Sequence, residues 1–258
     1  PYFEPYTILN KGGVKIAVIG MTNPNIPNWL APHLWDGIKF EEIVPSLEHW
    51  IEYVREKEQP HFLIVAMHAG LGDEASDSME NPARYVAKNV KGIDLLLAAH
   101  DHRIAAEKID NGEKEIWLLE GGSRAAALSK ASVALTVKDG AVVATNVDGE
   151  SISMEGVTPD AEYMAHFRDD FLKVKEFTNR EVGTLSNTIS SRDAYFGPSA
   201  YIDMIHTVQL NASGADISFA APLSFNATIN KGVLNYQNLL DIYPFENQLN
   251  VIEMTGSE

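Results

Sequence analysis

The sequence FLIVAMHAG occupies residues 62–70, and IDLLLAAHDH occupies residues 93–102. Both stretches are short and almost continuously apolar, which is typical of strands buried on both faces of a parallel sheet. Both also end in histidine, and the ligand sites of open α/β sheets lie at the carboxyl ends of the strands. We therefore expect His68, His100 and His102 to gather at one edge of a sheet.

These three imidazoles are candidate metal ligands. Side chains of an extended chain alternate with a period of two, so His100 and His102 are expected to point to the same side. Imidazole nitrogen binds Zn²⁺, Mn²⁺, Fe and Ni, and three such ligands suffice for a catalytic site with an open position. Three nearby carboxylates are candidates to orient the imidazoles: Asp73, Glu74 and Asp101. The alternative is that each histidine is an ordinary polar residue at the sheet margin and that Asp101 is an exposed loop acid.

The composition restricts the class of protein and its partners. The chain has 258 residues, 45% of them hydrophobic and 22% charged, as in ordinary globular domains. The absence of cysteine excludes disulfides and thiolate ligands, so a transition metal must be held by nitrogen or oxygen ligands. A formal net charge of -16 argues against a nucleic-acid duplex as partner, because duplex binding depends on Lys and Arg neutralising phosphates. An acidic protein can still act on phosphate esters if bound metal reverses the local field. No apolar run approaches the ~20 residues of a membrane span.

The pattern of apolar residues predicts a mixed α/β first domain. Strands alternate with amphipathic helices as in βαβ units, and later strands joined by tight turns read as antiparallel. The expected strands are residues 6–9, 14–20, 62–68, 93–98, 115–120, 131–137 and 142–146, and the expected helices are residues 40–58 and 81–90.

A long amphipathic helix is expected from Thr158, which can cap it, to about residue 178. Beyond it the pattern changes, and we place a domain boundary near residue 180. The elements expected in this second part are helices at residues 201–210 and 237–240 and strands at residues 215–220 and from residue 249. His206 lies on the first of these helices, where a packed or surface role is favoured over ligation, and His33, His49, His61 and His166 are given ordinary surface roles.

Two motifs resemble those of a known family. MHAG at residues 67–70 and AAHDH at residues 98–102 resemble the Ser/Met-His-x-Gly and Gly-His-x-His motifs of the calcineurin-like metallophosphoesterases, with Ala99 in place of the usual glycine. Other stretches are similar to the periplasmic nucleotidase branch, and more to the 2′,3′-cyclic-nucleotide 2′-phosphodiesterase/3′-nucleotidases than to the 5′-nucleotidases. They are PYTI at 5–8, VKIAVIG at 14–20, NIPNW at 25–29, GADISFAAPL at 214–223 and YPFEN at 243–247.

The resemblance implies an α/β fold, a four-layer α/β/β/α metallophosphoesterase sandwich joined by a helix to the start of an α+β nucleotidase C-terminal domain. The implied divisions are a partial phosphoesterase domain at 1–157, a linker helix at 158–180 and a partial substrate-binding domain at 181–258. The resemblance also implies two divalent metal ions (Zn, Mn, Fe or similar) in a longer parent protein, with His68 and His100 on one and His102 on the other.

The departures from the family pattern matter as much as the match. The first metal motifs of the family (Asp-x-His, Gly-Asp and Gly-Asn-His-Glu) precede the region matched here, and none of them occurs before His68 in this chain. The chain begins PYFEPY, without Met or a signal segment. We therefore expect both ends of the chain to be cut from a longer protein and the catalytic residues to lie before residue 1. With half a site, the chain alone is expected to have little or no phosphatase activity.

The second domain offers candidate substrate-binding residues. The sequence AAPLSFN at residues 220–226 replaces the Asn-Gly-Gly-Ile-Arg pattern of 5′-nucleotidases, which favours the cyclic/3′ branch. Phe225 could stack on a base and Asn226 could read its polar edge. The alternative, an ordinary loop aromatic beside a turn-forming Asn, is equally compatible with the sequence.

The expected function is metal-dependent hydrolysis of small nucleotide phosphate esters by a periplasmic or secreted enzyme. Two alternatives remain open: a related sugar- or sulfur-ester hydrolase on the same fold, and a degenerate, metal-free binding or scaffold module. The sequence does not decide the metal, the preferred base or the oligomeric state.

Overall fold

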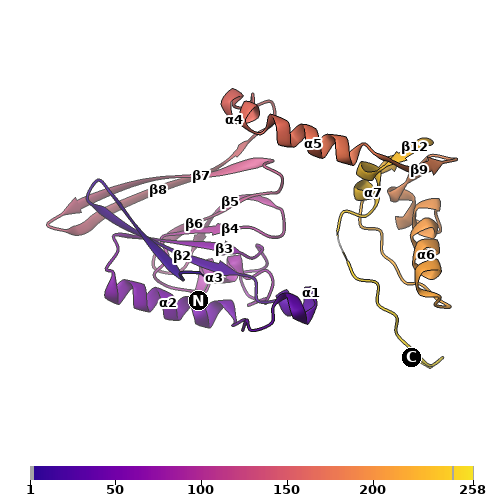
Figure 1. The fold of residues 1–258 in the computed structure, drawn as a ribbon. Coiled ribbons are helices and arrows are strands. Elements are labelled where there is room, and N and C mark those ends of the chain that lie inside the picture. Colours follow the sequence, from indigo (N-terminus) through magenta and orange to yellow (C-terminus); the bar gives the residue numbers. More distant parts are fainter. Residues whose placement is uncertain (1–2, 246, 258) are drawn as a thin grey trace. The chain divides into compact units, whose positions relative to one another are not determined.

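The computed structural model describes residues 3–245 and 247–257, so Pro1, Tyr2, Glu246 and Glu258 lie outside the described residues. The chain divides into two compact units, Pro1–Val157 and Thr158–Glu258 (Figure 1). Each unit has its own buried core. The two units are therefore described separately.

Unit 1 is built on a six-stranded mixed sheet with the strand order β1-β2-β3-β4-β6-β5. The four central strands β2, β3, β4 and β6 run parallel, and the edge strands β1 and β5 are antiparallel to their neighbours. The mixed sheet predicted from the sequence is thus confirmed. Its strands are β1 (Tyr6–Lys11), β2 (Val14–Thr22), β3 (Phe62–His68), β4 (Leu95–Ala98), β5 (Ile104–Asp110) and β6 (Glu115–Gly121).

The central strands are buried on both faces, as their continuous hydrophobicity predicts. In β3, Leu63, Val65 and Met67 belong to the main core, whereas Phe62 belongs to a second core. In β4 the adjacent residues Leu95 and Leu96 divide between the two cores in the same way. Period-two alternation therefore places successive side chains in different apolar layers.

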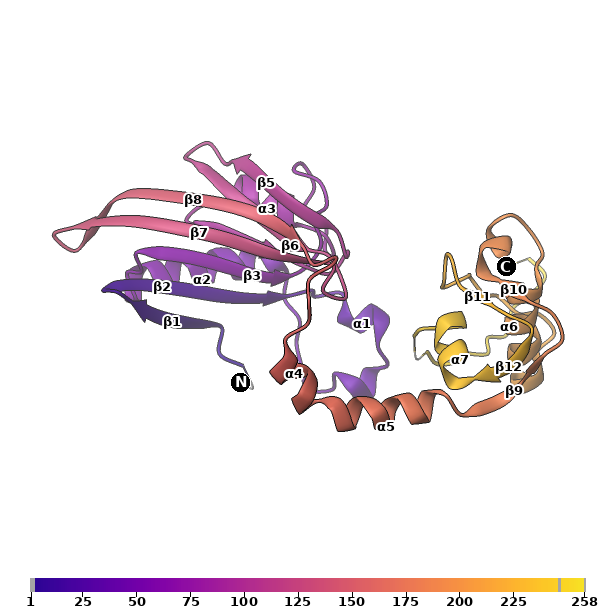
Figure 2. The same ribbon diagram turned by 90° about the horizontal axis from the view of Figure 1, so that it is seen from above.

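Three layers follow from this arrangement. Helices α2 (Ile43–Lys57) and α3 (Ala83–Asn89) cover one face of the sheet, and a two-stranded ribbon of β7 (Ala127–Lys138) and β8 (Ala141–Ser153) covers the other (Figure 2). The buried residues of α2 recur at helical spacing, which explains why this segment forms an amphipathic helix: Ile43, Leu47, Ile51 and Val54. The described residues of unit 1 form α/β/β layers, without a helical layer outside the ribbon.

The loop after β2 contains one helical turn, α1 (Ile26–Trp29), and a 3-10 turn, Pro32–Leu34. Proline stands in the first turn of each, where its missing N–H costs no intrahelical hydrogen bond. The sequence predicted an irregular loop here. The turns place Trp29 beside the ends of the neighbouring strands, where it contacts His100.

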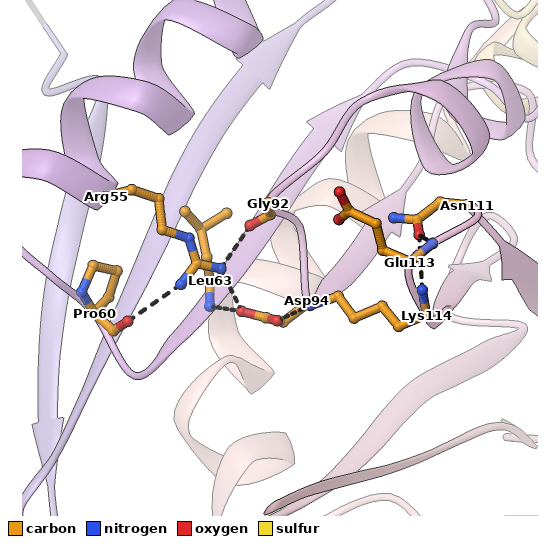
Figure 3. A network of polar contacts seen from close by, with 8 residues as sticks. All are labelled: Arg55, Pro60, Leu63, Gly92, Asp94, Asn111, Glu113 and Lys114. Atoms are coloured by element: carbon orange, nitrogen blue, oxygen red, sulfur yellow. Dashed lines mark hydrogen bonds and ion pairs between the residues drawn. The ribbon is translucent and has the colours of Figure 1, made fainter. Parts of the chain in front are cut away.

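A polar network ties the amino ends of β3 and β4 together (Figure 3). Asp94 Oδ2 accepts hydrogen bonds from Leu63 N (2.7 Å) and from Arg55 Nη2 (2.8 Å), and Asp94 Oδ1 pairs with Lys114. Arg55 also donates to the carbonyl of Gly92 at 2.6 Å. One carboxylate thus joins the end of α2, two strands and the β5–β6 turn.

The helix predicted over residues 158–178 begins later and is interrupted. It consists of α4 (Ala161–His166) and α5 (Arg168–Thr178), separated at Phe167, whose ψ is 4°. Asp160, rather than the predicted Thr158, caps it, because its carboxylate accepts a hydrogen bond from Tyr163 N at 2.7 Å.

Unit 2 has short elements and a small core. Five buried residues form that core: Ile189, Tyr201, Ile205, Ile229 and Ile242. The elements that follow α5 are β9 (Glu181–Leu185), β10 (Ile189–Ser190), a 3-10 turn (Ser191–Tyr195), α6 (Ala200–Ser213), β11 (Thr228–Ile229), β12 (Gly232–Asn235) and α7 (Tyr236–Ile242). Strands pair as β10–β11 and β12–β9.

Two predicted strands are wrong. Residues 215–220 and the described residues after 248 are not strands, because no described segment pairs with them. Their β-branched and aromatic residues are exposed instead, including Ile217, Phe219, Val251 and Ile252. Strand propensity marks a chain that can extend, but a strand also needs a hydrogen-bonded neighbour.

Among the described residues, no helix combines the length and the apolar composition needed to cross a membrane.

Candidate metal centre

The parallel strands of unit 1 end together at one edge of the sheet. Thr22 of β2 is paired in register with His68 of β3, and Ala98 of β4 is paired with Met67 on one side and Glu120 of β6 on the other. His68 is the last residue of β3, and His100 follows the end of β4 by two residues. The topology therefore brings both histidine-bearing ends to the same edge, as the sequence predicted.

His68 and His100 lie against each other. Their ring centroids are 5.3 Å apart and the rings are inclined by 70°. With metal–nitrogen bonds of about 2.0–2.1 Å, two rings at this spacing can turn one nitrogen each toward a common ion. This pair fits the prediction that the two histidines share a metal, and the ligand role of each remains a prediction.

His102 does not join them as expected. The prediction of an extended His100-x-His102 segment is wrong, because φ is +100° at His100 and +61° at His102. Both values lie in the left-handed region that disfavours residues with a Cβ, so the chain turns between the two histidines and strand alternation no longer sets their directions. No group of three histidine, aspartate or glutamate side chains is close enough to hold an ion in the described part of the chain.

Two residues that were not predicted as site residues lie against His100. Glu80 Oε1 lies 2.9 Å from His100 Nε2, and the indole of Trp29 stacks on the imidazole at 5.2 Å between centroids and 20° between planes. The sequence could have predicted that Trp29 lies near the histidines, because the loop after β2 must leave the same edge of the sheet as His68. The sequence gives no such indication for Glu80, which lies in the loop before α3 at no spacing that relates it to His100.

Gly70, the glycine of the first motif, is required for steric reasons. A Cβ on Gly70 would lie 2.1 Å from Asn81 Oδ1 and 2.8 Å from Asp101 Cγ. Gly70 N also donates to the carbonyl of Glu80 at 3.2 Å. The absence of a side chain therefore lets the loop after β3 approach the segment of Glu80 and the turn of His100.

Asp101 and Glu120 form a carboxyl pair beneath this turn. Asp101 Oδ2 accepts a hydrogen bond from Leu71 N at 3.0 Å, and Glu120 Oε1 accepts one from Arg103 N at 3.2 Å. Glu120 is only 1% exposed. Burial, together with the hydrogen bond and the negative charge of Asp101, raises the pKa of Glu120 to about 7. The pair links the loop after His68 to the turn that carries His100 and His102.

The three acids predicted to orient imidazoles have other contacts. Asp101 bonds to backbone and pairs with Arg103 at 3.6 Å. Asp73 and Glu74 are exposed; Asp73 accepts a hydrogen bond from Ala75 N, and Glu74 lies 4.0 Å from Lys88. None of these contacts joins an imidazole.

The other histidines have ordinary surroundings. His206 Nδ1 lies 2.8 Å from the hydroxyl of Ser218, and His61 Nδ1 accepts a hydrogen bond from Lys15 N. His49 packs edge-on against Trp50 and His166 against Phe167. His33 lies in the 3-10 turn after α1.

The predicted substrate-binding residues of unit 2 lie in one exposed cluster. Phe225 is 52% exposed and packs edge-on against Tyr195 at 5.0 Å. The Arg192 guanidinium lies over the Phe225 ring at 5.2 Å, and Arg192 Nη1 donates to Asn226 Oδ1 at 3.4 Å. Arg192 and Tyr195 were not predicted from the sequence. An aromatic ring beside a guanidinium group and an amide can recognise a planar, anionic ligand.

Comparison with a family of known domains identifies the second unit. Residues 181–258 match the family model described as 5′-nucleotidase, C-terminal domain. These residues are therefore similar to the C-terminal domain of the 5′-nucleotidases. The match begins at the first residue of β9, immediately after the interrupted helix.

Curated relatives span nearly the whole chain at low identity. The trifunctional nucleotide phosphoesterase protein YfkN of Bacillus subtilis is 24% identical over 99% of this chain and 17% of its own length. A 2′,3′-cyclic-nucleotide 2′-phosphodiesterase/3′-nucleotidase of Haemophilus influenzae is 24% identical over 100% of this chain and 46% of its own length. UshA of Yersinia enterocolitica is 20% identical over 99% of this chain and 53% of its own length. The chain thus spans about half the length, or less, of these relatives.

Solved structures show the same fold. A putative 5′-nucleotidase from Staphylococcus aureus aligns with a TM-score of 0.74 at 21% identity, covering 93% of this chain and 47% of that one. The sulfate thiohydrolase SoxB of Thermus thermophilus aligns with a TM-score of 0.64 at 18% identity, covering 95% and 43%. At this identity the likeness concerns the fold alone, which is a mixed α/β fold of the 5′-nucleotidase type.

Proposed function

We propose that this chain forms part of a two-metal phosphoesterase that hydrolyses small nucleotide phosphate esters, as a 2′,3′-cyclic-nucleotide phosphodiesterase/3′-nucleotidase or a 5′-nucleotidase. The observation that carries the proposal is the pair of adjacent imidazoles, His68 and His100, at the carboxyl edge of the sheet in a chain whose residues 181–258 match a nucleotidase C-terminal domain. The AAPLSFN stretch at residues 220–226 favours the cyclic/3′ branch.

The proposed organisation is a phosphoesterase domain at 1–157, a linker helix at 158–180 and a substrate-binding domain at 181–258. In this arrangement unit 1 supplies three layers of a four-layer α/β/β/α sandwich. We also propose a periplasmic or secreted location for the parent protein, by analogy with the branch that the sequence resembles.

Each candidate residue has a part in this proposal. His68 and His100 hold one divalent ion, His102 holds the second, and Phe225 and Asn226 bind the base. Divalent ions at such a site polarise the phosphate and activate a water molecule. The carboxyl pair of Asp101 and Glu120 keeps the two histidine loops together through hydrogen bonds to the backbone.

The test is metal analysis combined with phosphate release from 2′,3′-cyclic, 3′- and 5′-nucleotides by the complete parent protein. We expect His68→Ala, His100→Ala and His102→Ala to lower both metal content and turnover. His206→Ala is the matched control, because its imidazole contacts Ser218 in unit 2. Unchanged metal content and turnover in all three variants would contradict the proposal.

The chain by itself is proposed to be inactive, because no Asp-x-His, Gly-Asp or Gly-Asn-His-Glu motif precedes His68 in it. Incubation of the chain with nucleotide 3′-monophosphates and Mn²⁺ or Zn²⁺ tests this part. Release of phosphate at the rate of the parent protein would overturn it.

A metal-free binding or scaffold module is the second candidate. One observation favours it, namely that the described residues include no three-donor group of histidine or carboxylate side chains. The sequence encoded upstream of residue 1 distinguishes the two, since the phosphoesterase requires further Asp, His and Asn ligands there.

A further inference from the structure

His100 is held on three sides. Trp29 covers one face of the imidazole, His68 lies at its edge, and Glu80 Oε1 is 2.9 Å from Nε2. The side chain is 19% exposed, against 42% for Glu80. Nδ1 of His100 makes no hydrogen bond to any described residue. The one ring nitrogen without a partner is therefore Nδ1.

Glu80 is itself fixed in place. Its carbonyl accepts a hydrogen bond from Asn23 Nδ2 at 2.9 Å and another from Gly70 N at 3.2 Å. Asn23 is buried, and it follows β2 directly, while Gly70 follows β3. The backbone of Glu80 is thus anchored to the two loops that leave the same edge of the sheet, which sets the position of its carboxylate.

The backbone of His100 also needs support. Its φ of +100° is unfavourable for a residue with a Cβ, and conformations of this kind persist only where the surroundings hold them. The contacts from Trp29 and Glu80 to the ring supply such support. They also restrict the ring to one orientation.

We infer that Glu80 is a positioning residue for His100: its carboxylate accepts the Nε2 proton, holds the neutral imidazole in the Nε2–H tautomer, and leaves Nδ1 as the nitrogen that binds a divalent ion. A carboxylate on the second ring nitrogen of a ligating histidine fixes the tautomer and increases the basicity of the ligand. The inference deepens the proposed function and rests on it only for the metal step.

The tautomer can be measured without metal. Long-range ¹H–¹⁵N NMR spectra of the chain labelled with ¹⁵N-histidine, recorded at pH 8, distinguish Nε2–H from Nδ1–H for His100, assigned with His100→Gln. We expect the Nε2–H tautomer in the wild-type chain and in Glu80→Gln, whose amide oxygen still accepts the proton, and a mixture of tautomers in Glu80→Ala. The Nδ1–H tautomer in the wild type, or an unchanged spectrum in Glu80→Ala, would overturn the inference.

Glu74→Ala is the matched control, because Glu74 lies in the same loop and pairs with Lys88 rather than with an imidazole. Its spectrum is expected to equal that of the wild type. Circular dichroism and the thermal transition of each variant show whether it is folded. The Glu80→Gln variant keeps the test valid even if Glu80→Ala loosens the loop.

Titration of the same labelled chain with Zn²⁺ tests the metal step. We expect the Nδ1 resonance of His100 to shift on binding, and the affinity to fall about 10- to 100-fold in Glu80→Ala and less in Glu80→Gln. A shift at Nε2 instead would overturn the inference, because zinc would then have displaced Glu80. Absence of binding, with the Nε2–H tautomer established, would overturn the metal step of the inference and support the Glu80–His100 arrangement alone. It would not contradict the proposed function, which places further metal ligands outside this chain.

Discussion

The two units of the chain carry their candidate residues on different supports. In unit 1, the histidines end or follow strands that are buried on both faces, and the edge where they lie is cross-linked by Asp101, Glu120 and Glu80. In unit 2, Phe225 and Asn226 lie on an exposed loop above a core of five buried residues. A rigid edge suits metal binding, which needs precise geometry, whereas an exposed aromatic loop can adapt to a ligand.

The largest expected difference between the units concerns their cores. Leu96 is fully buried in β4, and Leu96→Ala is expected to lower the free energy of unfolding of unit 1 by about 3–5 kcal/mol, because it leaves a cavity. Leu239→Ala on α7, where the leucine is partly exposed, is expected to cost less than about 1 kcal/mol in unit 2. All four tryptophans lie in unit 1, so tryptophan fluorescence follows its unfolding selectively: Trp29, Trp35, Trp50 and Trp117. Hydrogen exchange follows the unfolding of unit 2. Equal losses of unfolding free energy in the two variants would contradict the expected difference between the two cores.

The polar network of Figure 3 is expected to stabilise the edge of the sheet opposite the histidines, at the amino ends of β3 and β4. Asp94→Ala removes the acceptor of Leu63 N and the partner of Arg55, both partly buried, and is expected to destabilise unit 1 by about 3 kcal/mol. Glu113→Ala is the control, because Glu113 belongs to the same network through its backbone N–H only. Denaturation followed by tryptophan fluorescence measures both. A loss below about 0.5 kcal/mol for Asp94→Ala would show that the network does not stabilise the sheet.

Glu120 makes the stability of unit 1 depend on pH. Its pKa is about 7 in the folded chain against 4.5 as its ordinary value, so the folded state binds more protons than the unfolded state between these values. The free energy of unfolding should therefore fall by on the order of 3 kcal/mol as pH rises from about 4.5 to 7, and level off at higher pH. Glu120→Gln, whose amide can donate to Asp101, is expected to remove this slope. Urea unfolding at pH 5, 6, 7 and 8 measures it, and an identical slope in the variant would contradict the assignment.

The smallest expected stability effect is in the exposed cluster of unit 2. Phe225→Ala is expected to change the stability of unit 2 by less than about 0.5 kcal/mol, because the ring is half exposed. The affinity for nucleoside monophosphates should nevertheless fall about five-fold or more, since stacking of a base on an aromatic ring contributes about 1–3 kcal/mol. Phe219→Ala is the control, being exposed without a ring contact among the described residues. Isothermal titration measures the affinity, and equal losses in both variants would exclude a specific role for Phe225.

The sequence predicted much of the fold, and the failures have physical causes. Periodicity located α2, α3, α6, α7 and the central strands, because a buried face forces a regular pattern of apolar residues. It failed at residues 215–220, where strand-like residues lack a pairing partner, and at Phe167, where the chain breaks a helix whose pattern continues. Both failures concern contacts and backbone angles that no local pattern records.

The candidate site also contains residues that the sequence predicted and residues that it did not. The sequence identified His68 and His100, because motifs at the ends of buried strands mark the ligand edge of an α/β sheet. It did not predict the positive φ values that turn His102 away from strand alternation, nor Glu80 and Trp29 around His100. Those residues come from separate loops whose meeting depends on the order of the strands in the sheet.

By itself, the sequence determined the α/β class, the buried strands, the histidines at their ends and the resemblance to the nucleotidase family. These features depend on residue type and on short-range spacing, which are local properties. Only the tertiary structure decided which ring nitrogen of His100 is free, why Gly70 cannot carry a side chain and why the pKa of Glu120 is raised to about 7. Each of these depends on groups brought together from separate loops and on their removal from water, which a linear pattern does not contain.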